Sequence, residues 1–158
     1  MTEKTKKSIR ICSIIALVSC ILWTVYEILY FIGLFTGWGV VDKKVDWSIN
    51  GMVKVVFFIF YLFSTVALLG LCFKVIVNTL HGMREGLAFP QSNVKPLLWL
   101  TLADFLYRLC WMNQLILFQD NFIFGFTGSN LIMPFLLLFF AFMYKVAADA
   151  VEENNLTI

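Results

Sequence analysis

Charged residues are scarce in this chain, where they make up 14% of 158 residues, against about a quarter of a typical soluble domain. The 12 basic and 10 acidic side chains nearly balance, and no cluster of lysine and arginine marks a nucleic-acid-binding face. Histidine occurs once, as His81, and the sequence contains no zinc-ligand spacing, no catalytic triad and no phosphate-binding glycine loop. We therefore expect no nucleic-acid partner, no metal or other cofactor and no enzymatic activity.

The chain contains four cysteines, and none of them lies in an expected loop. Cys12, Cys20, Cys72 and Cys110 all fall inside or at the edge of apolar runs. A disulfide framework needs cysteines in the loops of a secreted chain, so this distribution argues against one. We interpret the four thiols as small buried apolar side chains.

Hydrophobic residues, by contrast, make up 61% of the chain, and the mean hydropathy is +0.86. A helix crosses the hydrocarbon core of a bilayer with about 20 apolar residues. Four segments are long and apolar enough for this, residues 11–35, 55–77, 97–118 and 131–148. The sequence therefore predicts an all-α fold, an integral membrane four-helix bundle that forms one domain over residues 1–158, with the lipid bilayer as its solvent.

The distribution of basic residues predicts the orientation of these spans. One side of the membrane would hold eight basic residues, which are Lys4, Lys6, Lys7, Arg10, Lys74, Arg84, Lys95 and Lys145. The other side would hold three, which are Lys43, Lys44 and Lys54. Because basic residues accumulate in cytoplasmic loops, we expect both termini in the cytoplasm, an N-in and C-in topology.

The first span admits a second interpretation near its amino-terminal end. Residues 17–20 read Leu-Val-Ser-Cys after a basic stretch, which is typical of a bacterial lipoprotein signal with a lipidated Cys20. The apolar run nevertheless continues to Phe35, whereas the apolar region of a signal peptide has about 7–15 residues. The sequence favours an uncleaved first span, and lipidation of Cys20 is the alternative.

Two opposite charges, Asp104 and Arg108, stand four residues apart in the third span. A charge at the centre of a membrane helix costs about 2.5–3.5 kcal/mol on insertion scales, so such residues need a structural or functional role. At about 100° per residue they share a face with Tyr107, while Asn113 falls on the far side of the same helix. We expect Arg108 to bond Asp104 within its own helix and to reach a carboxylate of another span.

The first span supplies that carboxylate, Glu27, on a face of mostly small or polar residues. At helical periodicity this face contains Cys12, Ala16, Ser19, Trp23, Glu27, Tyr30, Gly33 and Gly37. Gly33 and Gly37 have the spacing that lets two helices approach closely. The other two spans have similar faces, which include Tyr61 in the second span and Pro134, Ala141 and Ala148 in the fourth. With these four polar stripes turned inward, we expect a polar network in the bundle core that comprises Glu27, Asp104, Arg108, Tyr30, Tyr61, Tyr107 and Gln114.

Two cytoplasmic segments are candidates for contact with a protein partner, the loop of residues 82–96 and the acidic tail of residues 152–158. In the loop, Gly86-Leu-Ala-Phe-Pro-Gln-Ser-Asn-Val-Lys-Pro-Leu97 resembles the segment before the third span in a bacterial family of small four-span membrane proteins of unknown function. The ending Leu-Thr-Ile resembles the end of the same family. The resemblance implies a four-helix bundle in the inner membrane, encoded beside small helix-turn-helix regulators, with no assigned activity.

These observations predict a non-enzymatic interaction or regulatory module of the bacterial inner membrane, in which the polar network holds the helices in register. The alternative is an oligomeric transporter subunit for a small solute, an ion or protons, in which the network carries the function. Four short helices enclose no path alone, so this alternative needs a homo-oligomer. A third role for the same charges is assembly with a partner protein.

Overall fold

The computed structural model describes residues 3–38, 41, 44–119 and 123–156, and this part of the chain contains helices and no strands. Its four long helices are α1 (Glu3–Thr36), α2 (Gly51–Arg84), α3 (Val94–Met112) and α4 (Ser129–Leu156). Two short 3-10 helices, η1 (Gln91–Asn93) and η2 (Gln114–Leu117), flank α3. The prediction of an all-α fold is confirmed. Lys43 and the last two residues of the acidic tail lie outside the described residues.

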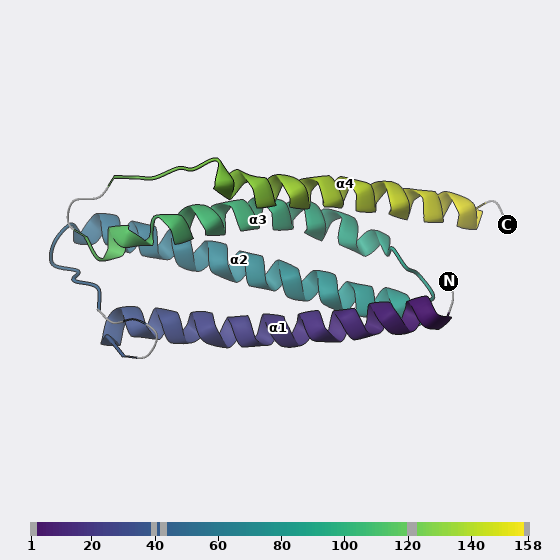
Figure 1. Cartoon of the computed structure of the whole chain (residues 1–158), viewed down its shortest axis with the longest axis horizontal. Coiled ribbons are helices and arrows are strands. Elements are labelled where there is room, and N and C mark those ends of the chain that lie inside the picture. The colour runs from purple at the N-terminus through teal and green to yellow at the C-terminus, as the bar shows by residue number, and fades with distance from the viewer. Residues whose placement is uncertain (1–2, 39–40, 42–43, 120–122, 157–158) are drawn as a thin grey trace.

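The helices α1 and α2 are longer than a bilayer core requires. Each has 34 residues, and the corresponding length is about 50 Å, against a hydrocarbon core of about 30 Å. The apolar part of each helix is the predicted span, and polar residues continue the helix beyond it. α1 therefore begins at Glu3 and α2 ends at Arg84, at the end of the molecule where α4 also ends (Figure 1).

By length and composition, three of the described helices could cross a membrane, namely α1, α2 and the part Asn130–Glu153 of α4. Exposed apolar side chains such as Leu22 and Phe63 cover their outward faces. α3 is shorter, with 19 residues, and contains both Asp104 and Arg108. It lies between α2 and α4, so these two neighbours shield much of its surface (Figure 1).

The helices pack in the order of the chain, α1 on α2, α2 on α3 and α3 on α4 (Figure 1). Among the described residues, the backbone of α4 makes no close approach to that of α1 or α2. The four polar stripes therefore do not converge on one central axis. Those of α1, α2 and α3 face one another, whereas the stripe of α4 packs on α3 and η1 through the buried residues Pro134, Ala141 and Ala148.

The buried face of α1 repeats every seven residues, through Ser13, Cys20, Glu27 and Leu34. The predicted stripe followed the period of a straight helix, which drifts by about 20° per heptad from a seven-residue repeat. It is correct near Glu27 but wrong toward the amino terminus, where Cys12 is exposed instead of buried. A seven-residue repeat is the pattern of two helices that wind around each other, and α2 is the helix on which α1 packs.

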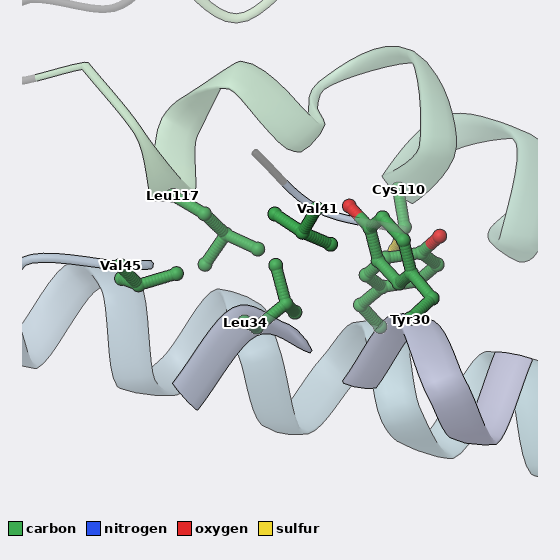
Figure 2. Packing of buried hydrophobic residues seen from close by; sticks show 7 residues of the cluster. Tyr30, Leu34, Val41, Val45, Cys110 and Leu117 are labelled. Atoms are coloured by element: carbon green, nitrogen blue, oxygen red, sulfur yellow. The ribbon is translucent and has the colours of Figure 1, made fainter. Parts of the chain in front are cut away.

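The hydrophobic core lies toward the end of the molecule opposite the start of α1. Its buried members are Tyr30, Leu34, Val41, Val45, Tyr61, Cys110 and Leu117 (Figure 2). The segment after α1 folds back, so that the Val45 N–H donates to the Leu34 carbonyl at 2.9 Å. A Cβ atom on Gly33 would lie 2.9 Å from the carbonyl oxygen of Trp38. Because Gly33 has no side chain, the returning segment can pack closely against α1 at this point. The expectation that a second helix packs there is wrong.

α3 ends at Met112, before the predicted end of the third span at Phe118. The cause is Asn113, whose side chain is buried although we expected it on the far side of the helix. Its amide group donates to the carbonyl oxygens of Leu109 at 2.8 Å and Gly125 at 2.9 Å. Its Oδ1 atom accepts a hydrogen bond of 2.7 Å from the Gly125 N–H. Asn113 thereby binds the segment before α4 to the end of α3, and the chain continues as η2.

Candidate functional site

Glu27 is the centre of a polar cluster between α1 and α3. The residue is on α1 and only 2% exposed. Its Oε1 atom accepts a hydrogen bond of 2.7 Å from the hydroxyl group of Tyr107 on α3, and another of 2.9 Å from the indole N–H of Trp23. Trp23 precedes Glu27 by four residues, which places both side chains on one face of α1. The carboxyl group thus links α1 to α3.

Two oxygen atoms of this cluster are buried and have no hydrogen-bond partner among the described residues, Oε2 of Glu27 and the hydroxyl oxygen of Tyr61. Tyr61 is fully buried on α2. Its ring centroid lies 6.0 Å from that of Tyr107 and 6.1 Å from that of Tyr30. Buried polar atoms without a partner are uncommon in folded proteins, and they mark this cluster as the candidate site.

Arg108 does not belong to this cluster. Its Nε atom donates to Oδ2 of Asp104 at 2.8 Å, which is the contact expected from their spacing within α3. The described part of the chain contains no ion pair between Arg108 and Glu27, so the predicted bridge between α3 and α1 is wrong. Side chains of a helix lean toward its amino terminus, so Arg108 reaches back along α3 to Asp104. The hydroxyl group of Tyr107, and not Arg108, bonds to Glu27.

The two members of this ion pair differ in exposure. The side chain of Asp104 is 9% exposed and that of Arg108 is 36% exposed. The Asp104 side chain is therefore enclosed by the protein, whereas part of the Arg108 side chain is exposed.

Tyr30 and Gln114 form a third polar contact, nearer the hydrophobic core. The hydroxyl group of Tyr30 donates to Oε1 of Gln114 at 2.8 Å and so joins α1 to η2. The seven residues expected in one network thus form three separate hydrogen-bonded pairs, with Tyr61 packed between the rings of Tyr30 and Tyr107. Trp23 was on the predicted stripe but not in the predicted network, and its spacing of four residues from Glu27 is the signal that would have found it.

A second buried polar cluster surrounds Asn93, at the opposite end of α3. Its amide group donates to Oγ1 of Thr79 at 2.9 Å and to the Val75 carbonyl at 3.2 Å. The hydroxyl group of Tyr144 on α4 donates to the Pro90 carbonyl at 3.2 Å. These contacts hold the segment between α2 and α3 against α2 and α4. Sequence reasoning did not single out Asn93, because a polar residue before an apolar span ordinarily indicates a helix end and not burial.

The segment between α1 and α2 is held by Lys54, which is buried in the first turn of α2. Its Nζ atom donates to the carbonyl oxygen of Asp46 at 2.8 Å. The exposed carboxylate of Asp46 accepts hydrogen bonds from the hydroxyl group of Ser48 at 2.6 Å and from its N–H at 3.0 Å. These two hydrogen bonds lower the pKa of the Asp46 carboxyl group from its usual value.

No group of three or more metal-ligating side chains occurs in the described part of the chain. Comparison of the chain with family models, with curated proteins and with solved structures found no match.

Proposed function

We propose that this chain is a multi-pass protein of a bacterial inner membrane, in which all four helices cross the bilayer and both termini lie in the cytoplasm. The length and apolar surface of α1, α2 and α4 support this placement, as does the position of α3 between α2 and α4. Eight basic residues belong to the end where α1 begins, whereas Lys44 and Lys54 are the described basic residues at the other end, which supports the orientation. The resemblance carried by residues 86–97 supports the bacterial location.

Reporter fusions test the orientation. Alkaline phosphatase is active only outside the cytoplasm, whereas green fluorescent protein folds well within it. We expect phosphatase activity when the enzyme is fused after Ile49, and fluorescence but no phosphatase activity for fusions after Ile158. The reverse pattern would show that the orientation is wrong.

The function that the geometry supports best is that of a membrane interaction module without enzymatic activity. The observation that carries it is the loop between α2 and α3. Asn93, a fully buried residue, fixes this loop in place. Gln91 also donates to Oδ1 of Asp149 at 2.8 Å, so the loop and the last turns of α4 form one surface. Phe89 is exposed on this loop. Binding to a preformed loop costs little conformational entropy, because the loop is already ordered. Aromatic side chains are enriched in protein–protein interfaces.

Photo-cross-linking from the loop tests this role. Benzoylphenylalanine replaces Phe89 in one variant and Phe63, on the outward face of α2, in a matched control, since both side chains are exposed. In living cells we expect a discrete cytoplasmic protein cross-linked from position 89 and only lipid adducts from position 63. The resemblance makes a small helix-turn-helix regulator the first candidate partner. Identical products at the two positions would contradict the interaction role.

The acidic tail is tested in the same experiment. If residues 152–158 contribute to the partner interface, their removal should lower the cross-linking yield from position 89. An unchanged yield would remove the tail from the proposed interface and leave the loop as its remaining part.

A second candidate function is an oligomeric transporter subunit for protons, an ion or a small solute. The observation that favours it is the pair of buried oxygen atoms without partners, Oε2 of Glu27 and the hydroxyl group of Tyr61. Helices packed in series enclose no path, so several copies would be required. The exposed part of Arg108 supports such assembly, because a guanidinium group inside a bilayer needs polar contacts.

Flux measurements in liposomes test this candidate. Glu27→Gln keeps the shape of the side chain and removes its charge, so proton or ion flux should fall if Glu27 carries it. Tyr26→Phe is the matched control, because Tyr26 is exposed on the same helix. Equal flux through the wild type and Glu27→Gln would exclude a transport role for Glu27.

A further inference from the structure

A cavity of about 710 Å³ is lined by residues of the first turns of α1 and the last turns of α2. The start of α1 and the end of α2 lie at the same end of the molecule (Figure 1). Four basic residues line it, Lys6, Lys7, Arg10 and Arg84. Lys6 and Arg10 are one helical turn apart and so share a face of α1, while Arg84 is the last residue of α2. The antiparallel packing of the two helices therefore brings basic residues from two distant parts of the sequence around one space.

These four positive charges are poorly compensated. One carboxylate lines the same cavity, that of Glu3, and it lies 3.8 Å from the ammonium group of Lys6. Within the described part of the chain, Lys7, Arg10 and Arg84 form no ion pair. Like charges that surround a cavity repel one another and create a positive potential inside it. The cavity is therefore suited to an anion.

The rest of the cavity wall is apolar. Ile14 of α1 and Leu80 of α2 line it about one turn further into the helices than Arg10 and Arg84, and Met83 of α2 lines it as well. This wall is continuous with the outward face of α1, where Ile11 and Ile15 are exposed. The complete surface thus combines a positive end with an apolar side, and a ligand that matches both has an anionic group joined to a hydrocarbon chain.

We propose that this cavity binds the phosphate group of an anionic phospholipid, with its acyl chains along the apolar wall. The guanidinium groups of Arg10 and Arg84 offer paired donors that match phosphate oxygens. A soluble phosphate ester would carry the same charge but would leave Ile14, Leu80 and Met83 without a partner, so the lipid is the favoured source. The placement of the cavity at the cytoplasmic leaflet, which is rich in anionic lipid, rests on the proposed orientation.

Native mass spectrometry of the full-length protein in detergent tests this site. The probes are dioleoylphosphatidylglycerol and dioleoylphosphatidylcholine, which share their acyl chains and phosphate but differ in net charge. The cavity variant combines Lys6→Gln, Arg10→Gln and Arg84→Gln. The matched control removes three basic residues at the same end of the molecule that do not line the cavity, by Lys4→Gln, Lys95→Gln and Lys145→Gln.

We expect the wild type and the control to bind phosphatidylglycerol in preference to phosphatidylcholine. The cavity variant should bind phosphatidylglycerol at least about tenfold more weakly, since each basic residue near a membrane surface contributes to lipid binding. An equal loss in both triple variants would assign binding to the overall charge and overturn the site. Equal binding of the two lipids by the wild type would overturn the selection of an anionic lipid.

Competition distinguishes the two sources of phosphate. Inorganic phosphate added to the wild type should leave the phosphatidylglycerol adduct in place. If it displaces the lipid, the cavity is a site for soluble phosphate and the lipid assignment is wrong. Because the protein is in detergent, none of these results depends on the orientation in the membrane, which the reporter fusions test separately.

Discussion

The hydroxyl group of Tyr107 donates a 2.7 Å hydrogen bond to Glu27, a residue 80 positions earlier in the chain. With the indole N–H of Trp23, it gives one carboxyl oxygen two donors in a region that is enclosed by α1, α2 and α3. The contact shows how the fold retains an acidic residue inside an apolar helix. It also joins α1 to α3, beside the ring contacts of Trp23 with Tyr107 and of Tyr30 with Trp111.

Replacement of Tyr107 by phenylalanine should destabilise the fold. The change removes one donor to the buried carboxyl group of Glu27, so we expect a loss of about 1–2 kcal/mol in the free energy of unfolding. Tyr26→Phe, at an exposed position of α1, should change it by less than about 0.5 kcal/mol. Reversible unfolding in mixed detergent, followed by circular dichroism, measures both. Equal effects of the two substitutions would mean that the Tyr107 hydroxyl group contributes nothing.

Asp104 and Arg108 should behave as an independent pair. Arg108→Ala leaves the buried carboxylate of Asp104 without its cation. This single variant should therefore destabilise the fold more than the double variant that combines Asp104→Ala with Arg108→Ala. By contrast, Glu27→Gln and Arg108→Ala should be additive within about 0.5 kcal/mol, because Arg108 pairs with Asp104 and Glu27 bonds to Tyr107. The same unfolding measurement gives all of these values. Strong coupling between Glu27 and Arg108 would instead support the bridge that the sequence predicted.

Gly33 should not tolerate a methyl group. A Cβ atom there would lie 2.9 Å from a backbone oxygen, that of Trp38, which cannot move cheaply, so Gly33→Ala should cost about 1–3 kcal/mol. Gly70→Ala is the control, because a Cβ atom on Gly70 would meet nothing within 4 Å. Alanine at position 70 should be neutral or stabilise α2 by up to about 1 kcal/mol. Melting temperatures that fall equally in both variants would contradict the role of Gly33 in admitting the returning segment.

The pKa of Asp46 should rise toward its usual value in Ser48→Ala, because the hydroxyl hydrogen bond is the largest cause of the lowered pKa. A carboxyl group with a lower pKa in the folded state stabilises that state above the unfolded pKa, and the contribution is lost as the pH falls through the folded pKa. Acidification below about pH 4 should therefore destabilise the wild type slightly more than Ser48→Ala. An NMR titration of the Asp46 carboxyl carbon measures the pKa, and an unchanged value would refute the assignment.

The helices were predictable because their signal is local. Four apolar runs of suitable length predicted four helices, and each observed helix contains most of its predicted span. Their ends were less predictable. α1 and α2 extend through polar residues that carry no apolar signal, and α3 stops early because Asn113 bonds to Gly125, a contact that only the folded chain contains.

Of the residues expected in one network, the structure brings Glu27, Tyr107 and Tyr61 together and places Arg108 elsewhere. The i,i+4 contact of Asp104 with Arg108 follows from helix geometry and is present. The partner of Glu27 is Tyr107 instead of Arg108, because the direction in which a side chain leans decides which group it reaches. The shift of the buried face from Cys12 to Ser13 has a similar origin, since the winding of α1 on α2 is a property of two helices.

The sequence by itself determined the secondary structure and the apolar character of this protein, because hydropathy and helical periodicity depend on residues close together in the chain. It also determined the ion pair within α3. Only the tertiary structure decided that the helices pack in series, that Tyr107 bonds Glu27, and that Arg10 and Arg84 line one cavity. Each of these depends on the rotation and register of one helix against another, which are set by the packing of side chains that the sequence places far apart.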